Sequence, residues 1–229
     1  MLADMRTVPL ASEIRDKVLH SRNRFWRPED FEGSADAVVK TLSRLEAAGE
    51  LRRVRRGLYW RGMSTPLGMA PPPADRLVRA VVHEPGTGPA SWSAALALGL
   101  STQVPRREVI AVPGRAPQDT RGVHFVSRSS GTGRRDERLR PAEVAVLEVL
   151  RGWEELVETP LPEAVVRIGC LIDAGTVRVD HLVRASRTEP SRVRQRLRRL
   201  LVALGREADA SRVPAARSGS VGRDLALVA

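Results

Sequence analysis

Residues 25–60 read FWRPEDFEGSADAVVKTLSRLEAAGELRRVRRGLYW, and the order of signals in this stretch decides the fold of the first part of the chain. Ser34 is a favourable N-cap residue, and Gly49 supplies the left-handed residue that commonly follows the end of a helix. Between them the spacing predicts a helix with one buried stripe, made of Ala37, Val38, Thr41, Leu42 and Leu45.

The residues after Gly49 alternate as in a two-stranded hairpin. The side chains expected to point inward are Leu51, Val54, Leu58 and Trp60, and residues 55–57 are expected at the tip. Arg52, Arg53, Arg55 and Arg56 all lie on this hairpin. Because guanidinium groups bind phosphate oxygens in a bidentate way, the hairpin is suited to contact a nucleic-acid backbone.

The residues upstream complete the pattern. Residues 9–21 have helical spacing, residues 25 and 26 begin an extended segment, and residues 28–31 form a small second helix. Three helices followed by a basic hairpin are typical of a winged helix-turn-helix, whose last helix directs exposed side chains into the major groove. The predicted DNA-binding residues are Ser34, Asp36, Lys40, Arg44, Arg52, Arg53, Arg55 and Arg56.

The charge of the chain agrees with a polyanionic partner. The net charge is +11 and the isoelectric point is about 11.3. Residues 40–61 contain seven basic and two acidic residues, whereas residues 1–39 contain six basic and seven acidic residues. The positive charge is therefore concentrated in one half of the first domain. Two alternatives remain: the hairpin is only a solvated surface, or the arginine content reflects coding bias.

Two motifs together resemble a known family. Residues 37–60, AVVKTLSRLEAAGELRRVRRGLYW, are similar to the N-terminal winged-helix domain of AbiEi-type antitoxins. Residues 93–105, SAALALGLSTQVP, are similar to the segment that follows this domain in the same family, where they have either a structural or a contact role. The family forms the antitoxin half of AbiE abortive-infection (phage-defence) toxin-antitoxin systems.

The resemblance implies a function for the whole chain. It implies a transcriptional autorepressor that binds inverted repeats in its own promoter, as a dimer or cooperatively, and counters an AbiEii-like nucleotidyltransferase toxin. It requires no catalytic residue and no cofactor. The alternative is a winged-helix regulator without a toxin, whose C-terminal domain senses a small molecule or a protein. A sensing pocket is usually rich in aromatic residues, and this domain has only Trp92, Phe125 and Trp153.

The sequence predicts an α+β protein in which the winged helix-turn-helix is followed by a mixed α/β domain that ends in a helical, bundle-like half. We expect the first domain at residues 1–61, a Pro/Gly-rich linker at 62–74, the second domain at 75–205, and a poorly ordered tail at 206–229. Ser91 or Ser93 is expected to cap a helix that ends at Gly99.

The remaining elements follow from periodicity. Strands are predicted at 108–112 and 123–127, then an exposed polar loop at 128–140, then helices from Pro141, over 162–173, 179–185 and 192–204. The last helix is arginine-rich and either forms a second basic surface or is simply solvated. The residues of that candidate surface are Arg192, Arg194, Arg196, Arg198 and Arg199.

The sequence argues against an enzyme and a metal site. The four histidines are dispersed, and no lysine follows Lys40, which excludes a nuclease motif of the D…(D/E)xK type. Cys170 is the only cysteine and lies in an apolar helical pattern, so we expect it in the core. No apolar run is long enough for a signal peptide or a membrane span, so we expect a cytoplasmic protein.

Overall fold

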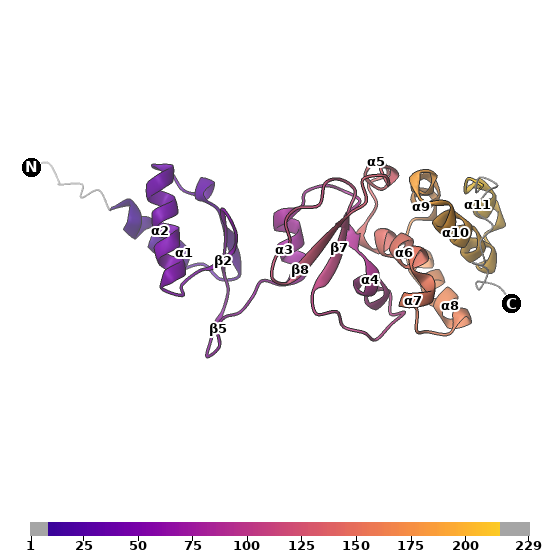
Figure 1. The fold of residues 1–229 in the computed structure, drawn as a ribbon, viewed down its shortest axis with the longest axis horizontal. Coiled ribbons are helices and arrows are strands. Elements are labelled where there is room, and N and C mark those ends of the chain that lie inside the picture. The colour runs from indigo at the N-terminus through magenta and orange to yellow at the C-terminus, as the bar shows by residue number, and fades with distance from the viewer. Residues whose placement is uncertain (1–8, 216–229) are drawn as a thin grey trace, which may run out of the picture. The chain divides into compact units, whose positions relative to one another are not determined.

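The computed structural model describes residues 9–215 and divides into two compact units between Ala80 and Val81 (Figure 1). Each unit contains helices, strands and a hydrophobic core of its own. The prediction of an α+β protein is confirmed. We describe the two units separately.

Unit 1 begins with helical and extended segments, continues with two hairpins and ends in a helix. Its elements are α1 (Leu10–Leu19), β1 (Arg24–Trp26), the 3-10 helix η1 (Pro28–Asp30), α2 (Ala35–Ala47), β2 (Arg52–Arg55), β3 (Leu58–Arg61), β4 (Ser64–Thr65), β5 (Gly68–Met69) and α3 (Ala74–Val81). Strands β1, β3 and β2 form an antiparallel sheet in that order. The predicted sequence of elements over residues 9–61 is confirmed.

The core of unit 1 lies between its first helices and this sheet. It contains Ile14, Val18, Trp26, Val38, Leu42, Leu45, Leu51 and Tyr59. Two predicted details are wrong. Ala37 is exposed, because it lies at the edge of the stripe on α2. Tyr59 is buried in the core of unit 1, and its neighbours Leu58 and Trp60 are buried as well, because β3 is the central strand and side chains on both of its faces are covered.

The segment predicted as a linker contains a small hairpin and leads into α3. Strands β4 and β5 pair antiparallel within residues 64–69. Helix α3 is held by two hydrogen bonds: Arg76 Nη1 donates to the backbone oxygen of Asn23, and Arg27 Nη2 donates to the backbone oxygen of Ala80. These bonds explain why the division falls after Ala80, whereas the sequence places the second domain from residue 75.

Unit 2 combines a small sheet with a group of helices. Its elements are β6 (Gly88–Pro89), α4 (Ser91–Ala97), β7 (Glu108–Val112), β8 (Val123–Ser127), α5 (Gly133–Asp136), α6 (Pro141–Arg151), α7 (Trp153–Leu156), α8 (Leu161–Asp173), α9 (Val179–Ala185), the 3-10 helix η2 (Ser186–Thr188), α10 (Ser191–Ala203) and α11 (Glu207–Arg212). Strands β7 and β8 are parallel, and β6 pairs antiparallel with β7. The predicted strands and the helix over 179–185 are confirmed.

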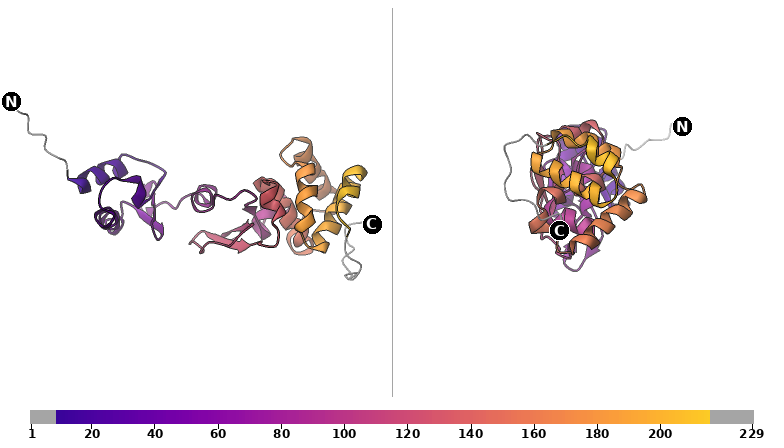
Figure 2. Two further views of the ribbon diagram at one scale, coloured as in Figure 1. Left: turned by 90° about the horizontal axis from the view of Figure 1, so that it is seen from above. Right: turned by 90° about the vertical axis from the view of Figure 1, so that its right-hand side faces the viewer.

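Helix α6 is the centre of unit 2. Every residue from Glu143 to Leu150 is buried. Helix α6 packs against α4, β6 and α10, and Figures 1 and 2 show the sheet on one side of it and the orange-to-yellow helices on the other. A helix that is buried all round must satisfy its polar residues internally, and this requirement places charged groups in the core.

Several predictions for unit 2 are corrected. Helix α4 begins at Ser91 with Ala90 at its N-cap, and the Oγ of Ser93 accepts a hydrogen bond from the backbone nitrogen of Val109 instead of capping the helix. Cys170 is exposed, because it lies on the outer face of α8. Helix α11 lies inside the predicted tail and buries Ala210, whereas residues 216–229 are outside the described residues.

Candidate nucleic-acid interface

Helix α2 presents a polar outer face. Asp36, Lys40 and Arg44 are all exposed on it, and Val39 lies among them with 42% of its surface exposed. Ser34 occupies the N-cap position, but its side chain makes no capping hydrogen bond, which corrects the prediction of its role. After α2, Gly49 adopts a φ of 73°, and the backbone nitrogen of Glu50 donates to the oxygen of Leu45, so the chain turns directly into β2.

The β2–β3 hairpin carries the predicted arginines. Arg53 and Arg56 are exposed, Arg55 is half-exposed, and Gly57 provides the left-handed turn residue with a φ of 72°. Arg52 differs from the other three, because its Nη1 donates to the backbone oxygen of Met69 at 3.0 Å. Arg52 therefore joins the two hairpins of unit 1.

The cations on α2 and the hairpin have no internal partners. Within residues 9–215, the side chains of Lys40, Arg44, Arg53, Arg55 and Arg56 form no ion pair or hydrogen bond. We call these five residues the basic face. A group of cations that form no ion pair within residues 9–215 attracts anions.

Acidic groups of unit 1 gather elsewhere. A groove of about 380 Å³ between α1 and η1 is lined by Glu13, Glu29, Asp30 and Glu32, with Lys17 among them. Its charge is opposite to that of the basic face. The polarisation predicted from residues 1–39 and 40–61 is thus present in the structure.

The structure removes Arg196 from the predicted second basic surface. Arg196 is buried, and its Nη1 donates to the backbone oxygen of Leu150 at 2.8 Å, while Glu154 pairs with its Nη2. Arg192 donates to the oxygen of Arg151. Arg192 and Arg196 thus cap the C-terminal carbonyl groups of α6. Of the predicted set, Arg194 donates to the Oγ of Ser191, Arg199 is half-buried with a partner of its own, and Arg198 is exposed.

The polar interval predicted as an exposed loop contains a buried arginine. The side chain of Arg134, on α5, is 0% exposed; its Nε lies 2.6 Å from Glu189 Oε1 and its Nη1 lies 2.7 Å from Glu148 Oε1. Arg128 pairs with Glu148 at 2.8 Å, and Arg151 with Glu189 at 2.9 Å. We call these five side chains the buried ion cluster. Local sequence patterns do not predict this cluster, because it joins residues from three separate segments of the chain.

The motif at residues 101–103 has a structural role. The carboxylate of Glu158 accepts hydrogen bonds from the Oγ of Ser101 at 2.8 Å, the backbone nitrogen of Thr102 at 3.0 Å and the Nε2 of Gln103 at 2.9 Å. These bonds, the backbone bond of Thr102 first, hold the pKa of Glu158 below its usual range. The motif fastens the segment after α4 to the connection between α7 and α8.

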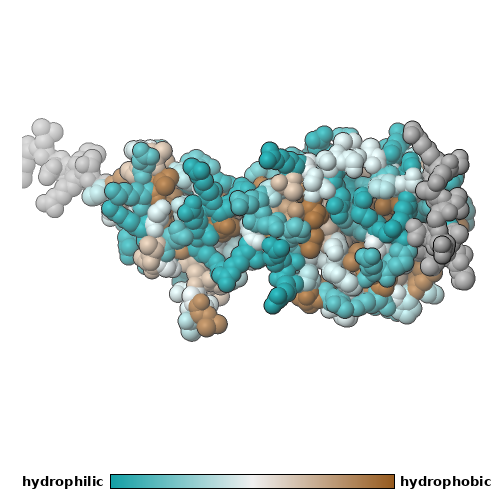
Figure 3. Space-filling view, viewed as in Figure 1, coloured by the Kyte–Doolittle hydropathy of each residue, from teal (hydrophilic) through white to brown (hydrophobic). Residues whose placement is uncertain are grey.

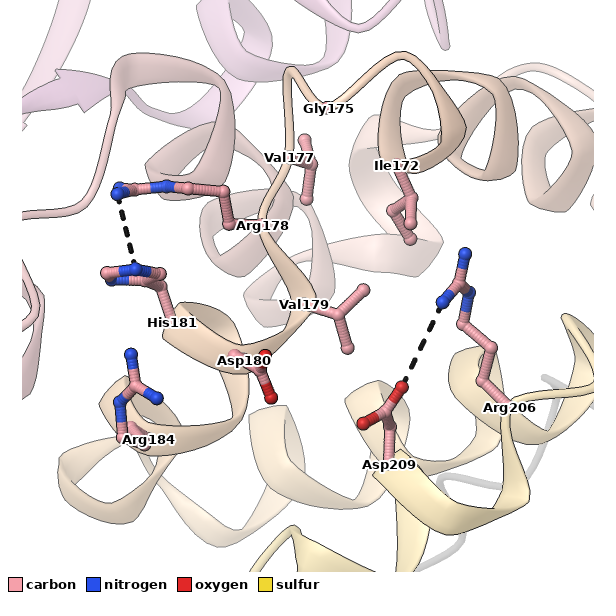
Figure 4. A pocket seen from close by; sticks show the side chains of 10 residues that line it. All are labelled: Ile172, Gly175, Val177, Arg178, Val179, Asp180, His181, Arg184, Arg206 and Asp209. Atoms are coloured by element: carbon pink, nitrogen blue, oxygen red, sulfur yellow. Dashed lines mark hydrogen bonds and ion pairs between the residues drawn. The ribbon is translucent and has the colours of Figure 1, made fainter.

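A groove of about 470 Å³ lies beside α8, α9 and α11 (Figure 4). Its charged groups pair with acids or bases: Arg184 lies 2.7 Å from Glu137, Arg206 lies 3.0 Å from Asp173, and Asp180 lies 2.7 Å from Arg212. None of its lining residues is a phenylalanine, tyrosine or tryptophan. The groove therefore gives little support to a small-molecule sensor.

The described residues form neither a metal-binding group nor a membrane-spanning helix. Residues 9–215 contain no group of three or more histidine, cysteine or acidic side chains placed to hold a metal ion. In the same residues, no helix has the length and apolar character needed to cross a bilayer.

Comparison with known proteins identifies a fold but no activity. Residues 17–125 match a family described as a family of unknown function, DUF6088. No curated protein matches the chain. The chain resembles the crystal structure of the RV2827C protein from Mycobacterium tuberculosis, with a TM-score of 0.51 and 20% sequence identity over 92% of this chain and 82% of that one. At this identity the likeness concerns the fold alone.

Proposed function

We propose that unit 1 is a winged helix-turn-helix that binds double-stranded DNA, with α2 in the major groove and the β2–β3 hairpin as the wing. The observation that carries the proposal is the basic face: five cations without internal partners on the outer side of α2 and on the adjoining hairpin. The arginines of the buried ion cluster, by contrast, are paired with carboxylates.

The exposed side chains of α2 and those of the β2–β3 hairpin have different tasks. Asp36, Val39 and Lys40 are exposed on α2, and side chains in these positions read base edges. Arg53, Arg55 and Arg56 on the hairpin bind phosphates, which fixes the orientation of the protein but carries no sequence information. Discrimination between sites therefore depends on α2, and general affinity on the hairpin.

We further propose, from the resemblance to AbiEi-type antitoxins, that the protein represses its own operon by binding inverted repeats and opposes a nucleotidyltransferase toxin in the cytoplasm. Unit 2 then supplies the antitoxin activity without catalysis. Co-expression with the neighbouring gene tests this half: growth should be restored by the full chain, and failure of rescue by a well-expressed chain would contradict it.

DNA binding is tested by fluorescence anisotropy with the protein's own upstream DNA and a scrambled duplex over a series of salt concentrations. The three phosphate contacts of Arg53, Arg55 and Arg56 predict a slope of log affinity against log salt of about −2.7. The double variant Arg55→Ala/Arg56→Ala should reduce the magnitude of the slope by about 2 and weaken both duplexes alike. Lys40→Ala should reduce the preference for the upstream DNA.

The matched control is Arg198→Ala, which removes an exposed arginine from α10 in unit 2. It should leave both affinity and slope unchanged. A salt-independent affinity, or an equal effect of Arg198→Ala and the hairpin variant, would show that binding reflects the total charge of the chain and not the basic face.

A further inference from the structure

The β4–β5 hairpin ends in one fully exposed leucine. Leu67 has a relative exposure of 101%, and its neighbours Ser64, Thr65, Pro66 and Gly68 are also exposed. The hairpin projects from unit 1 (Figure 1), and its tip is hydrophobic on the molecular surface (Figure 3). A single exposed leucine is common in proteins, so the structure of the hairpin around Leu67 must show whether this residue has a role.

The turn that presents Leu67 is closed by hydrogen bonds and by residues with restricted backbone angles. Thr65 and Gly68 pair across it, and the Oγ1 of Thr65 donates to the backbone oxygen of Gly68 at 2.6 Å. Pro66 fixes its own φ, and Gly68 adopts a φ of 95°, which a residue with a side chain adopts only with strain. The leucine is therefore held at the apex of a defined turn.

The base of this hairpin is attached to the strands of the wing. Arg52 Nη1 donates to the oxygen of Met69 at 3.0 Å, and Trp60 Nε1 donates to the oxygen of Ala70 at 3.0 Å. Gly62 allows this close approach, since a Cβ at its position would lie 2.7 Å from the oxygen of Ala70. The base of the Leu67 hairpin is thus attached to the strands that carry Arg53, Arg55 and Arg56.

We propose that Leu67 is an apolar wedge that enters the minor groove of the bound DNA, partly unstacks one base step and bends the duplex. The inference rests on the proposed DNA binding and adds a second contact to it. Minor-groove proteins insert aliphatic side chains in this way and kink the duplex by about 20–90°. Ser64 and Thr65 place hydroxyl groups beside the leucine, where sugar and phosphate oxygens would lie.

The size of the feature favours DNA over a protein partner. A specific protein interface buries on the order of 1,000 Å² or more, with several apolar residues at its centre. On this hairpin the only large apolar side chains that are mostly exposed are Leu67 and Met63, as far as the described residues show. A narrow hairpin with one aliphatic side chain at its tip, in the same unit as the unpaired guanidinium groups, has the dimensions of a groove contact.

The test uses the full chain and an upstream duplex of about 30 base pairs with a fluorescence donor and acceptor at its ends, a length that bends little on its own. The wild-type protein should bring the ends together. Leu67→Ala and Leu67→Ser should bind about tenfold more weakly and leave the duplex straight, because the burial of the leucine is lost. Leu67→Met keeps an apolar side chain and should retain the bend.

Two controls complete the design. Val104→Ala removes a side chain that is 79% exposed in unit 2 and should change neither affinity nor bending. Arg55→Ala/Arg56→Ala should weaken binding but retain bending at saturation. The melting temperature of Leu67→Ala should equal that of the wild type, since the exposed side chain stabilises nothing in the free protein.

The outcomes separate the wedge from the proposed function. If the wild type binds its upstream DNA and Leu67→Ala binds and bends it equally well, the wedge is refuted and the DNA-binding proposal stands. If the wild type binds no DNA, both are refuted. If sedimentation shows that the free protein is a dimer that Leu67→Ala dissociates, the tip contacts a second copy and the wedge is again refuted.

Discussion

The buried ion cluster should contribute more to the stability of unit 2 than any exposed ion pair. We consider Arg134→Met, which keeps much of the apolar volume of the side chain and removes its charge. Arg134 donates to Glu189 from Nε at 2.6 Å and from Nη2 at 3.0 Å, and to Glu148 from Nη1 at 2.7 Å. Burial by itself would lower the pKa of Arg134, but these two carboxylates raise it, so the wild-type side chain stays charged.

The magnitude follows from what the variant leaves behind. Glu148 and Glu189 are nearly fully buried, and each retains only one of its ion pairs at hydrogen-bond distance, with Arg128 and Arg151 respectively. Removing one partner of a buried pair costs about 3–5 kcal/mol, because the remaining charge is uncompensated. For a unit of this size that loss lowers the melting temperature by about 10 °C.

The neighbouring substitution Arg135→Met is the matched control. Arg135 is half exposed and lies 3.9 Å from Asp136, an arrangement that contributes at most about 1 kcal/mol. Both variants are unfolded thermally and with urea and followed by circular dichroism at 222 nm, where the helices of unit 2 dominate. If Arg134→Met lowers the free energy of unfolding no more than Arg135→Met does, the cluster does not stabilise the unit.

The effect should depend on pH. Burial would raise the pKa of Glu148, but the hydrogen bond from Arg128 and the charge of Arg134 hold it below its usual range. A carboxyl group with a lowered pKa stabilises the fold above its unfolded pKa, about 4.3, and this contribution is lost as the pH falls through the folded pKa. Arg134→Met raises the folded pKa of Glu148. The variant should therefore differ most from the wild type above about pH 5, and the difference should shrink below about pH 4. A difference that grows on acidification would contradict this account.

Two further predictions concern single positions. Gly62→Ala should destabilise unit 1 by about 1–3 kcal/mol in a thermal melt, because the added Cβ would lie 2.4 Å from Trp60 Nε1. The control is Gly122→Ala, whose Cβ would meet no atom within 4 Å. Equal stability of the two variants would contradict the tight packing at Gly62. Cys170 is exposed, so a thiol reagent should modify it in the native protein without urea. If the thiol of Cys170 reacted only in the presence of urea, Cys170 would lie in the core, as the sequence predicts.

The sequence predicts those features that depend on neighbouring residues. The caps, periodicity and turns of residues 9–61 locate α1, α2 and the β2–β3 hairpin, and strands β7 and β8 begin and end at the predicted residues. The exposed positions of Lys40 and Arg44 follow from the same local periodicity. Local signals were therefore sufficient for the order of elements over residues 9–61 and for the exposure of Lys40 and Arg44.

The sequence fails where a residue's environment depends on distant segments. Arg134 and Arg196 are polar residues with charged neighbours in sequence, yet both are buried, because carboxylates and carbonyl oxygens from other helices satisfy them. The prediction for Cys170 is wrong in the opposite sense: it is expected in the core but is exposed, because its apolar neighbours face the core while its own position on α8 faces outward. A residue count cannot distinguish a paired arginine from a free one.

This difference decides how the net charge of +11 should be interpreted. Arg134, Arg178 and Arg196 each lie within hydrogen-bond distance of a carboxylate in unit 2, so their charges are largely compensated. The cations of the basic face have no such compensation within residues 9–215. Cations that neutralise DNA phosphates release the counterions condensed on the DNA, and an arginine already paired with a carboxylate contributes less to this release. The total charge thus indicates only the class of partner, because it counts compensated and uncompensated arginines alike.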